Sequence, residues 1–325
     1  MEFLKDLVYL FIFPGFIFSI IMGLLLAGID RKIVARMQRR RGPKITQPIY
    51  DLVKLLGKDT IIPSNANERL FKIAPIMALI SISIIPLFIH LYNRPFIGGI
   101  ADIVVILYLL IIPSVALIVG GMSSSSPFAS IGVSREVVTM VAYELPLIIV
   151  LISVCKKAGL VLGGNMTFSF ANIATAQQNS SSFLFTLSLL PAAIAFLMII
   201  PGKVGVAPFD ASEAETELCE GPLAEYSGFQ LGVFKLTHNI KVYVMTMLFV
   251  ALFLGGVGVE TGTAWIDVLV NIVILIILVI VISTLFLSIV RGLMARYKTH
   301  QIFKFYWTVP TILSLISYVL VTFNI

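Results

Sequence analysis

The stretch WIDVLVNIVILIILVIVISTLFLSI, residues 265–289, decides the fold class. Across these 25 residues only Asp267 carries a charge. A helix needs about 20 predominantly apolar residues to cross the hydrocarbon core of a bilayer, and this stretch is long enough to do so. We therefore expect it to form a transmembrane helix.

The same pattern recurs along the whole chain, which has 325 residues, 58% of them hydrophobic and 12% charged. Soluble domains carry roughly 25% charged residues, so this chain cannot solvate the surface of a soluble protein. The composition predicts an all-α integral membrane protein that forms a single transmembrane domain over residues 1–325. It excludes a soluble enzyme, a disordered chain and a disulfide scaffold. The expected spans are 7–29, 74–92, 100–121, 136–154, 183–201, 230–254, 265–289 and 305–323.

The cysteines and histidines give no ligand set for a metal or a cofactor. Cys155 and Cys219 do not form a CxxC pair, and the three histidines lie on different expected segments. We therefore expect no cofactor or metal within this chain. The net charge of +6 is attributed to membrane topology rather than to nucleic acid, which is not an expected partner.

Lysine and arginine are distributed unequally between the two sets of connecting loops. Sixteen fall on the side that contains the 30–73 loop, and four fall on the opposite side. Cytoplasmic loops of membrane proteins are enriched in these residues. The sequence thus predicts a multi-pass protein of the cell membrane, with the 30–73 and 203–228 loops cytoplasmic and both termini outside.

The first cytoplasmic loop combines a basic cluster with a short amphipathic segment. The first span is expected to continue through DRKIVARMQRRRGP and to stop at Gly42-Pro43. The following QPIYDLVKLLGKD places apolar residues at helical spacing, which predicts a helix lying in the membrane interface. This loop either contacts lipid alone or forms a docking surface for a cytoplasmic partner. The candidate docking residues are Arg36, Arg39, Arg40, Arg41, Lys44, Tyr50, Asp51 and Lys54.

The fourth span begins SREVVTMVAYELPL and places carboxylates inside an apolar helix. A charge at the bilayer centre costs at least ~2.5 kcal/mol, so Glu136 and Glu144 should face protein or water. Glu136, Tyr143 and Glu144 can share one stripe of the helix. Glu136 has a purely structural alternative, a pair with Arg135 near the cytoplasmic end. Glu144 lies deeper and is a stronger candidate for a functional role.

The segment KVGVAPFDASEAETELCEGPLAEYSG, residues 203–228, concentrates carboxylates on the side that is otherwise basic. A capping box between Asp210 and Glu213 predicts a short acidic helix over 211–220, with Glu213, Glu217 and Glu220 on one face and Glu215 turned away. Clustered carboxylates in partly apolar surroundings raise one another's pKa and can exchange protons near neutral pH. The alternative is a solvated acidic face in which Asp210 is only a cap.

The sixth span adds Lys235 and His238 to the ionisable groups expected beside these acids. Such a row inside a membrane protein is typical of a proton relay. The candidate proton-path residues are Glu144, Glu213, Glu215, Glu136, Glu217, Glu220, Glu225, Asp210, Lys235 and His238.

Taken together, three stretches resemble the membrane subunit that forms the floor of the quinone site in respiratory complex I. They also resemble its homologues in energy-converting membrane-bound [NiFe] hydrogenases and in the related sulfane sulfur reductase. The stretches are RMQRRRGPKITQPIYDLVKLLGKD, SREVVTMVAYELPL and PFDASEAETELCEGPLAEYSG. In the complex I subunit a longer, glycine-containing segment separates the GP from the QP. Here only Lys44-Ile45-Thr46 separate them, which favours the hydrogenase branch and makes quinone an unexpected ligand.

The resemblance implies a membrane anchor and proton-coupling subunit of a redox complex, with no redox centre of its own. It implies three kinds of partner: a [NiFe]-hydrogenase-like large subunit, an iron-sulfur small subunit and antiporter-like membrane subunits. The [4Fe-4S] clusters, and in one branch a [NiFe] centre, would lie in those partners. Glu144, Glu213 and Glu215 look like the family's foremost proton-transfer residues.

Three alternatives remain open. The first is the quinone-site subunit of a complex I-like dehydrogenase that uses NADH or F420H2. The second is a stand-alone secondary transporter, against which stands the lack of an inverted repeat. The third is a purely structural anchor, for which replacing Glu144 or Glu213 by glutamine would leave ion translocation intact.

Overall fold

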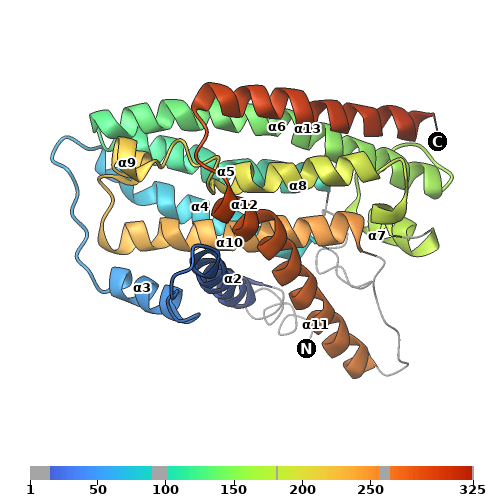
Figure 1. Ribbon diagram of the computed structural model, residues 1–325, viewed down its shortest axis with the longest axis horizontal. Coiled ribbons are helices and arrows are strands. Elements are labelled where there is room, and N and C mark those ends of the chain that lie inside the picture. Colours follow the sequence, from blue (N-terminus) through green and yellow to red (C-terminus); the bar gives the residue numbers. More distant parts are fainter. Residues whose placement is uncertain (1–14, 90–101, 181, 256–263, 324–325) are drawn as a thin grey trace.

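The computed structural model describes residues 15–89, 102–180, 182–255 and 264–323. Within these ranges the protein is a bundle of long helices, most of them aligned with the long axis of the molecule (Figure 1). The long helices are α2 (Phe16–Met37), α4 (Glu68–Phe88), α5 (Ile103–Ser123), α6 (Pro127–Val161), α8 (Leu190–Val204), α10 (Gly228–Phe253), α11 (Ala264–Ser283) and α13 (Thr299–Thr322). The shorter ones are α3 (Gln47–Leu56), α7 (Phe170–Asn179), η1 (Phe183–Phe185), α9 (Glu215–Leu218), η2 (Gly221–Leu223), the π-turn η3 (Thr284–Ser288) and α12 (Ile289–Leu293).

Six helical segments in the described ranges are long and apolar enough to cross a membrane: α4, α5, α6, α10, α13 and Leu269–Leu293, which joins α11, η3 and α12. With α2 and the shorter α8 they correspond to the eight expected spans. The predicted class, an all-α integral membrane protein, is confirmed. At the centre lies α10, whose residues are almost all buried and which packs against α2, α4, α8 and α11.

Two spans differ from their predicted limits because prolines start both helices. The fourth span, expected over 136–154, is the 35-residue α6, which begins at Pro127 after Ser126. Glu136 is therefore more than two turns inside the helix. The fifth span, expected over 183–201, is the 15-residue α8, which begins at Leu190-Pro191 and ends where Gly205 adopts a left-handed conformation. Lys203, expected in a loop, belongs to its last turn.

The first connecting loop contains the predicted amphipathic helix, and the helix before it is shorter than expected. The residues of α3 match QPIYDLVKLL, with Pro48 in its first turn and Gly57 at its end. Its apolar face is partly exposed, because Ile49, Val53 and Leu56 all face outward. The extension of α2 to Gly42-Pro43 is wrong: α2 ends at Met37, and Arg39 turns the chain with a φ of 57°.

The acidic loop, residues 205–227, does not form the predicted helix over 211–220. Only Glu215–Leu218 is helical, and it is followed by Cys219 and Glu220 in left-handed conformations. Asp210 caps nothing, because both of its carboxylate oxygens accept hydrogen bonds from Arg296. Contacts from distant helices thus replace the local capping pattern. The expected single face of Glu213, Glu217 and Glu220 is wrong for the same reason.

Four connections meet at one end of the bundle, which we call the loop end. The main-chain N–H of Ile61 donates to the Ser227 hydroxyl at 2.8 Å. The N–H of Tyr297 donates to the Pro208 carbonyl at 3.0 Å, and that of Asn67 to the Ser123 carbonyl at 2.9 Å. The loop end therefore joins the 38–67 region, the turn between α5 and α6, the acidic loop and the segment between α12 and α13. The opposite end carries α7, where the Gln177 amide donates to the Ala251 and Leu252 carbonyls.

Candidate functional site

A cavity of about 310 Å³ lies between α2, α5, α6, α10, η3 and the acidic loop. Its wall is rich in ionisable side chains that come from four helices and from the acidic loop. Those side chains are Asp30, Arg31, Glu136, Glu213, Glu215, Glu220, Lys235, His238, Lys241 and Arg291. Both signs of charge face the same space, so the cavity favours water and ions over an apolar ligand.

Glu136 reaches this cavity from the first third of α6 and is buried. The hydroxyl of Ser212, in the acidic loop, donates to its Oε2 at 2.7 Å. The alternative of an Arg135–Glu136 pair is wrong, because Arg135 turns the other way and bonds to Glu217 at 2.7 Å. Glu136 therefore holds the acidic loop against α6 and keeps a carboxylate at the cavity wall.

Glu213 lies next to Ser212 and also faces the cavity. Desolvation at this wall raises the pKa of Glu213 to about 7, assisted by the carboxylate of Glu136 and opposed by the ammonium group of Lys241. A carboxyl group with a pKa near 7 is populated in both protonation states at neutral pH. Glu213 can therefore accept and release protons under physiological conditions.

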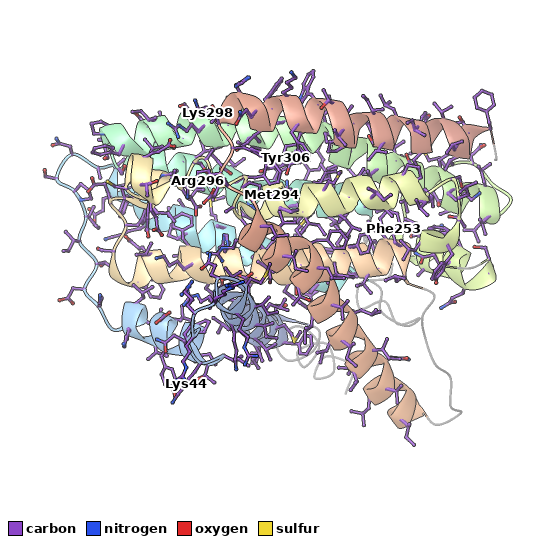
Figure 2. All side chains as sticks on the ribbon, in the orientation of Figure 1. Lys44, Phe253, Met294, Arg296, Lys298 and Tyr306 are labelled. Carbon is purple, nitrogen blue, oxygen red and sulfur yellow. The ribbon has the colours of Figure 1, made fainter. Side chains whose placement is uncertain are left out.

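Two arginines hold the outer part of the acidic loop. Arg296 binds Asp210 through two hydrogen bonds of 2.8 and 2.7 Å and also donates to Thr216 (Figure 2). Arg135 binds Glu217, and this hydrogen bond lowers the pKa of the Glu217 carboxyl group. Such bidentate and charge-assisted contacts position a loop well even where the net stabilisation of a surface pair is small.

The six acids of the loop thus divide into three sets. Glu213, Glu215 and Glu220 line the cavity, and Lys235 lies 3.6 Å from Glu220. Asp210 and Glu217 are engaged by the arginines, and Glu225 is exposed and does not line the cavity. His238 lines the cavity from α10. The structure therefore brings together only part of the predicted set.

Glu144 lies apart from the cavity, on the other side of a buried layer. It lines a lateral groove of about 400 Å³ that is otherwise apolar, formed by α5, α6 and Trp307 of α13. Its Oε1 accepts a hydrogen bond from Lys203, whose side chain is fully buried. Sequence reasoning placed Lys203 in a loop and missed this pair. The sequence could have indicated this position, because Lys203 follows the apolar stretch by less than one helical turn and can continue its helix.

Lys241 and Ser114 connect the cavity to this buried layer. The Lys241 ammonium donates to the Ser114 hydroxyl at 3.4 Å, and that hydroxyl shares a hydrogen bond of 3.1 Å with the Tyr143 hydroxyl. The ring of Tyr143 lies 4.9 Å from the Lys203 ammonium. Sequence analysis named neither Lys241 nor Ser114 as a site residue. Lys241 could have been recognised from the sequence, because a lysine is unusual within an apolar span. Ser114 could not, because a serine in such a span gives no signal.

The η3 π-turn interrupts the long helix formed by α11 and α12 beside the cavity. Ser283, Leu287 and Ser288 line the cavity at this turn. Just beyond it, Arg291 binds Asp30 of α2 at 2.6 Å. π-Turns inside helices occur frequently at functional sites, because they place side chains that a regular helix would turn away.

The candidate docking residues lie on the outside of the loop end. All are exposed except Asp51, which is half-buried and binds Arg31 at 2.7 Å. The hydrogen bond from Arg31 holds the pKa of the Asp51 carboxyl group below its usual value. Lys44 points away from the helices (Figure 2). The surface that these residues form is therefore basic and open to solvent.

Comparisons with known proteins agree with this architecture. A family model described as NADH dehydrogenase matches residues 9–322. The chain belongs to this family. The H subunit of NADH-quinone oxidoreductase from Dehalococcoides mccartyi strain 195 is 31% identical over 331 residues, covering 98% of this chain and 86% of the relative. Its counterpart from Rickettsia bellii is 32% identical over 309 residues, covering 90% and 86%.

A solved structure of a similar protein matches this chain over almost its whole length. It is a chain from the membrane-bound sulfane sulfur reductase, an archaeal respiratory membrane complex. The match has a TM-score of 0.85 and 29% sequence identity, and it covers 98% of this chain and 99% of the other. This member of the NADH dehydrogenase family is therefore a multi-pass membrane subunit of a respiratory membrane complex.

Proposed function

We propose that this family member is the membrane anchor and ion-coupling subunit of a hydrogenase-type or sulfane-sulfur-reductase-type complex. It links electron transfer in a peripheral arm to the movement of H⁺ or Na⁺. The cavity at the loop end is the observation that carries the proposal. It brings several carboxylates together with lysine and arginine side chains. The pKa of one of these carboxyl groups, that of Glu213, is about 7.

Two features favour this branch over a quinone-reducing one. The connection Lys44-Ile45-Thr46 is short and packs on α2, where Gly28 leaves no room for a Cβ against the Ile45 carbonyl. The cavity is lined by charged groups interspersed with apolar ones, and by no residue of α3. A long apolar quinone tail would lose free energy in such surroundings, since it would desolvate ionised groups without pairing them.

The positive charge of the loop end indicates what kind of soluble partner binds there. The exposed cluster Arg39, Arg40, Arg41 and Lys44 forms a basic surface suited to an acidic face of a soluble subunit. We assign to that position a [NiFe]-hydrogenase-like large subunit and an iron-sulfur small subunit with [4Fe-4S] clusters. We place the redox centres in these partners, as the family resemblance implies.

Purification through a tag on this chain in mild detergent tests the proposal. We expect iron-sulfur partners to co-purify and the eluate to evolve hydrogen or to reduce sulfane sulfur. Replacing Arg39, Arg40 and Arg41 together by glutamine should reduce retention of the soluble partners about tenfold at low salt, because electrostatic docking is lost. Replacing Lys156 and Lys157 at the opposite end is the matched control and should change nothing. A lone chain without partners would contradict the proposal.

A second candidate is the quinone-site subunit of a complex I-like dehydrogenase. The names of the curated relatives favour it. It predicts quinone-linked activity in the same eluate, inhibited by quinone analogues, together with quinone bound after extraction. The hydrogenase branch predicts neither.

The remaining alternatives differ in what mutation does to ion movement. If the chain is only a structural anchor, Glu144→Gln and Glu213→Gln leave translocation by the reconstituted complex intact. If it couples ions, both variants lower the number of ions moved per electron. A stand-alone transporter would move a solute in liposomes as a single purified chain.

A further inference from the structure

Lys203 is the one fully buried lysine that forms an ion pair with a carboxylate, that of Glu144, in the described parts of the chain. The Lys203 side chain has no exposed surface, and that of Glu144 is 13% exposed. Lys203 lies in the last turn of α8, where the helix dipole favours a cation, and it points inward toward α6. Gly202, beside it, packs closely against Tyr306 of α13.

A buried ion pair of this kind is rarely a device for stability. Desolvating both charges costs several kcal/mol, and a well-packed apolar pair often replaces such a bridge without loss. One oxygen of the pair, Glu144 Oε2, is buried and has no hydrogen-bond partner among the described residues. Buried polar atoms are usually satisfied, so an unpartnered carboxylate oxygen beside a buried lysine calls for a functional reason.

The position of the pair supplies that reason. The cavity lies on one side, with Glu136, Glu213 and Lys241 in its wall. The lateral groove lies on the other side, and Glu144 is the one ionisable group among the described residues that line it. Between them the Ser114 and Tyr143 hydroxyls connect Lys241 to the aromatic ring beside Lys203. Lys203 therefore lies in the buried layer between the two spaces, and Glu144 lies at the edge of that layer that borders the groove.

The charged and titratable groups around Lys203 come from three helices. Glu144, Tyr143 and, further off, Glu136 lie on α6, Lys241 lies on α10, and Tyr306 lies on α13. The Tyr306 hydroxyl donates to the Met198 carbonyl and is occupied. Within the part of the chain that the structure describes, Glu144 is the one carboxylate that contacts the lysine directly.

We propose that Lys203 is a proton-carrying residue of this chain, which passes protons from the cavity to Glu144 and so to the lateral groove. The proposal rests on the ion-coupling function proposed above and adds the step that crosses the buried layer. The pair works as a unit in which Lys203 is buried beside Tyr143 and Glu144 lines the groove.

The step balances in protons and charge. The Lys203 ammonium transfers one proton to the Glu144 carboxylate, which leaves a neutral amine and a neutral acid. The amine then takes a proton from the cavity side, where the hydrogen-bonded groups of Lys241, Ser114 and Tyr143 lie nearest to it. Glu144 finally releases its proton into the groove, and the original pair is restored. One proton has crossed, and the pair carries one extra positive charge only between the reprotonation of Lys203 and the release of the proton from Glu144.

Two variants of the complete complex, reconstituted in vesicles, separate this role from a structural one. Lys203→Arg keeps the positive charge and the pairing, but a guanidinium does not release its proton. The double variant Lys203→Met/Glu144→Gln removes both charges together and leaves no buried ion without a partner. A purely structural bridge tolerates both changes, whereas a proton-carrying lysine tolerates neither.

The readout is the number of ions translocated per electron transferred, with the amount of assembled complex measured in parallel. We expect both variants to assemble and to lower this ratio at least tenfold. Lys72→Arg and Lys72→Met are the matched controls, because Lys72 forms an exposed pair with Glu68 on α4. They should keep the wild-type ratio.

The outcomes are distinct. If the wild-type complex translocates ions and Lys203→Arg assembles and does so at the wild-type ratio, the role of Lys203 is overturned while the coupling function stands. If Lys203→Arg fails to assemble, Lys203→Gln decides in the same way, because it is smaller, keeps a hydrogen-bond donor for Glu144 and carries no transferable proton. If the wild-type complex moves no ions, the coupling function itself falls, and this proposal falls with it.

Discussion

At the scale of single residues, Glu213 shows how position in the fold sets protonation. Its pKa is raised from 4.5 to about 7, first by desolvation and then by Glu136. Between these two values the folded protein binds a proton that the unfolded chain has released. The contribution of Glu213 to the free energy of unfolding therefore falls as the pH rises through this window. Burial of this carboxyl group thus lets it exchange protons near neutral pH, and it lowers the free energy of unfolding at that pH.

Infrared difference spectroscopy between pH 6 and pH 8 tests this directly. We expect a protonated carboxyl band that disappears as the pH rises through about 7, and we expect Glu213→Gln to abolish it. Glu225→Gln is the control, since Glu225 is exposed outside the cavity and the band should persist. A band that survives in Glu213→Gln would assign the titration to another group.

The sequence predicted the candidate carboxylates but not the residues that bind them. The carboxylates were recognisable because they interrupt an apolar pattern. The partners of Glu136 and Glu144 were not, because Ser212 and Lys203 are separated from them by 76 and 59 residues. Such contacts depend on how helices pack, and helical spacing within one segment does not predict them.

At the scale of helices and loops, the packing of η2 fixes the acidic loop. Pro222 lies against Gly121 of α5 and Gly132 of α6, and a Cβ on Gly132 would approach its Cδ to 2.6 Å. Gly132→Ala should therefore destabilise the protein by about 1–3 kcal/mol, as overpacking does, although alanine is the better helix former. Thermal unfolding in detergent and proteolysis of residues 205–227 measure this effect.

Gly164→Ala is the control for that substitution, because a Cβ there meets nothing within 4 Å. The control should unfold like the wild type. If Gly132→Ala also does so, with the loop still protected from protease, then the contact with η2 does not hold the acidic loop in place.

The same loop explains which elements could be predicted. The long helices follow from hydrophobicity, and α3 follows from its amphipathic spacing, proline and glycine. The helix over 211–220 was wrong because its signals were local, whereas Arg296 and Arg135 bind Asp210 and Glu217 from elsewhere in the bundle. Tertiary contacts outweigh helix propensity in a segment of about ten residues, which is only marginally helical by itself.

At the scale of the whole molecule, the distribution of positive charge predicts that the loop end faces the cytoplasm. The native cysteines allow a test, because Cys219 is exposed in the acidic loop and Cys155 is buried. A membrane-impermeant maleimide should label Cys219 in inside-out vesicles and leave it unlabelled in right-side-out vesicles. Gly164→Cys in a Cys219→Ser background places the thiol at the opposite end and should give the reverse pattern.

The two thiols together make the result decisive even where soluble partners cover the acidic loop. If Cys219 is shielded, labelling of Gly164→Cys only in right-side-out vesicles still places the loop end in the cytoplasm. The reverse labelling of Gly164→Cys would place the cavity and the basic surface outside. Cytoplasmic electron-transfer subunits could not then reach Arg39, Arg40 and Arg41, and the docking proposal would fail with the orientation on which it depends.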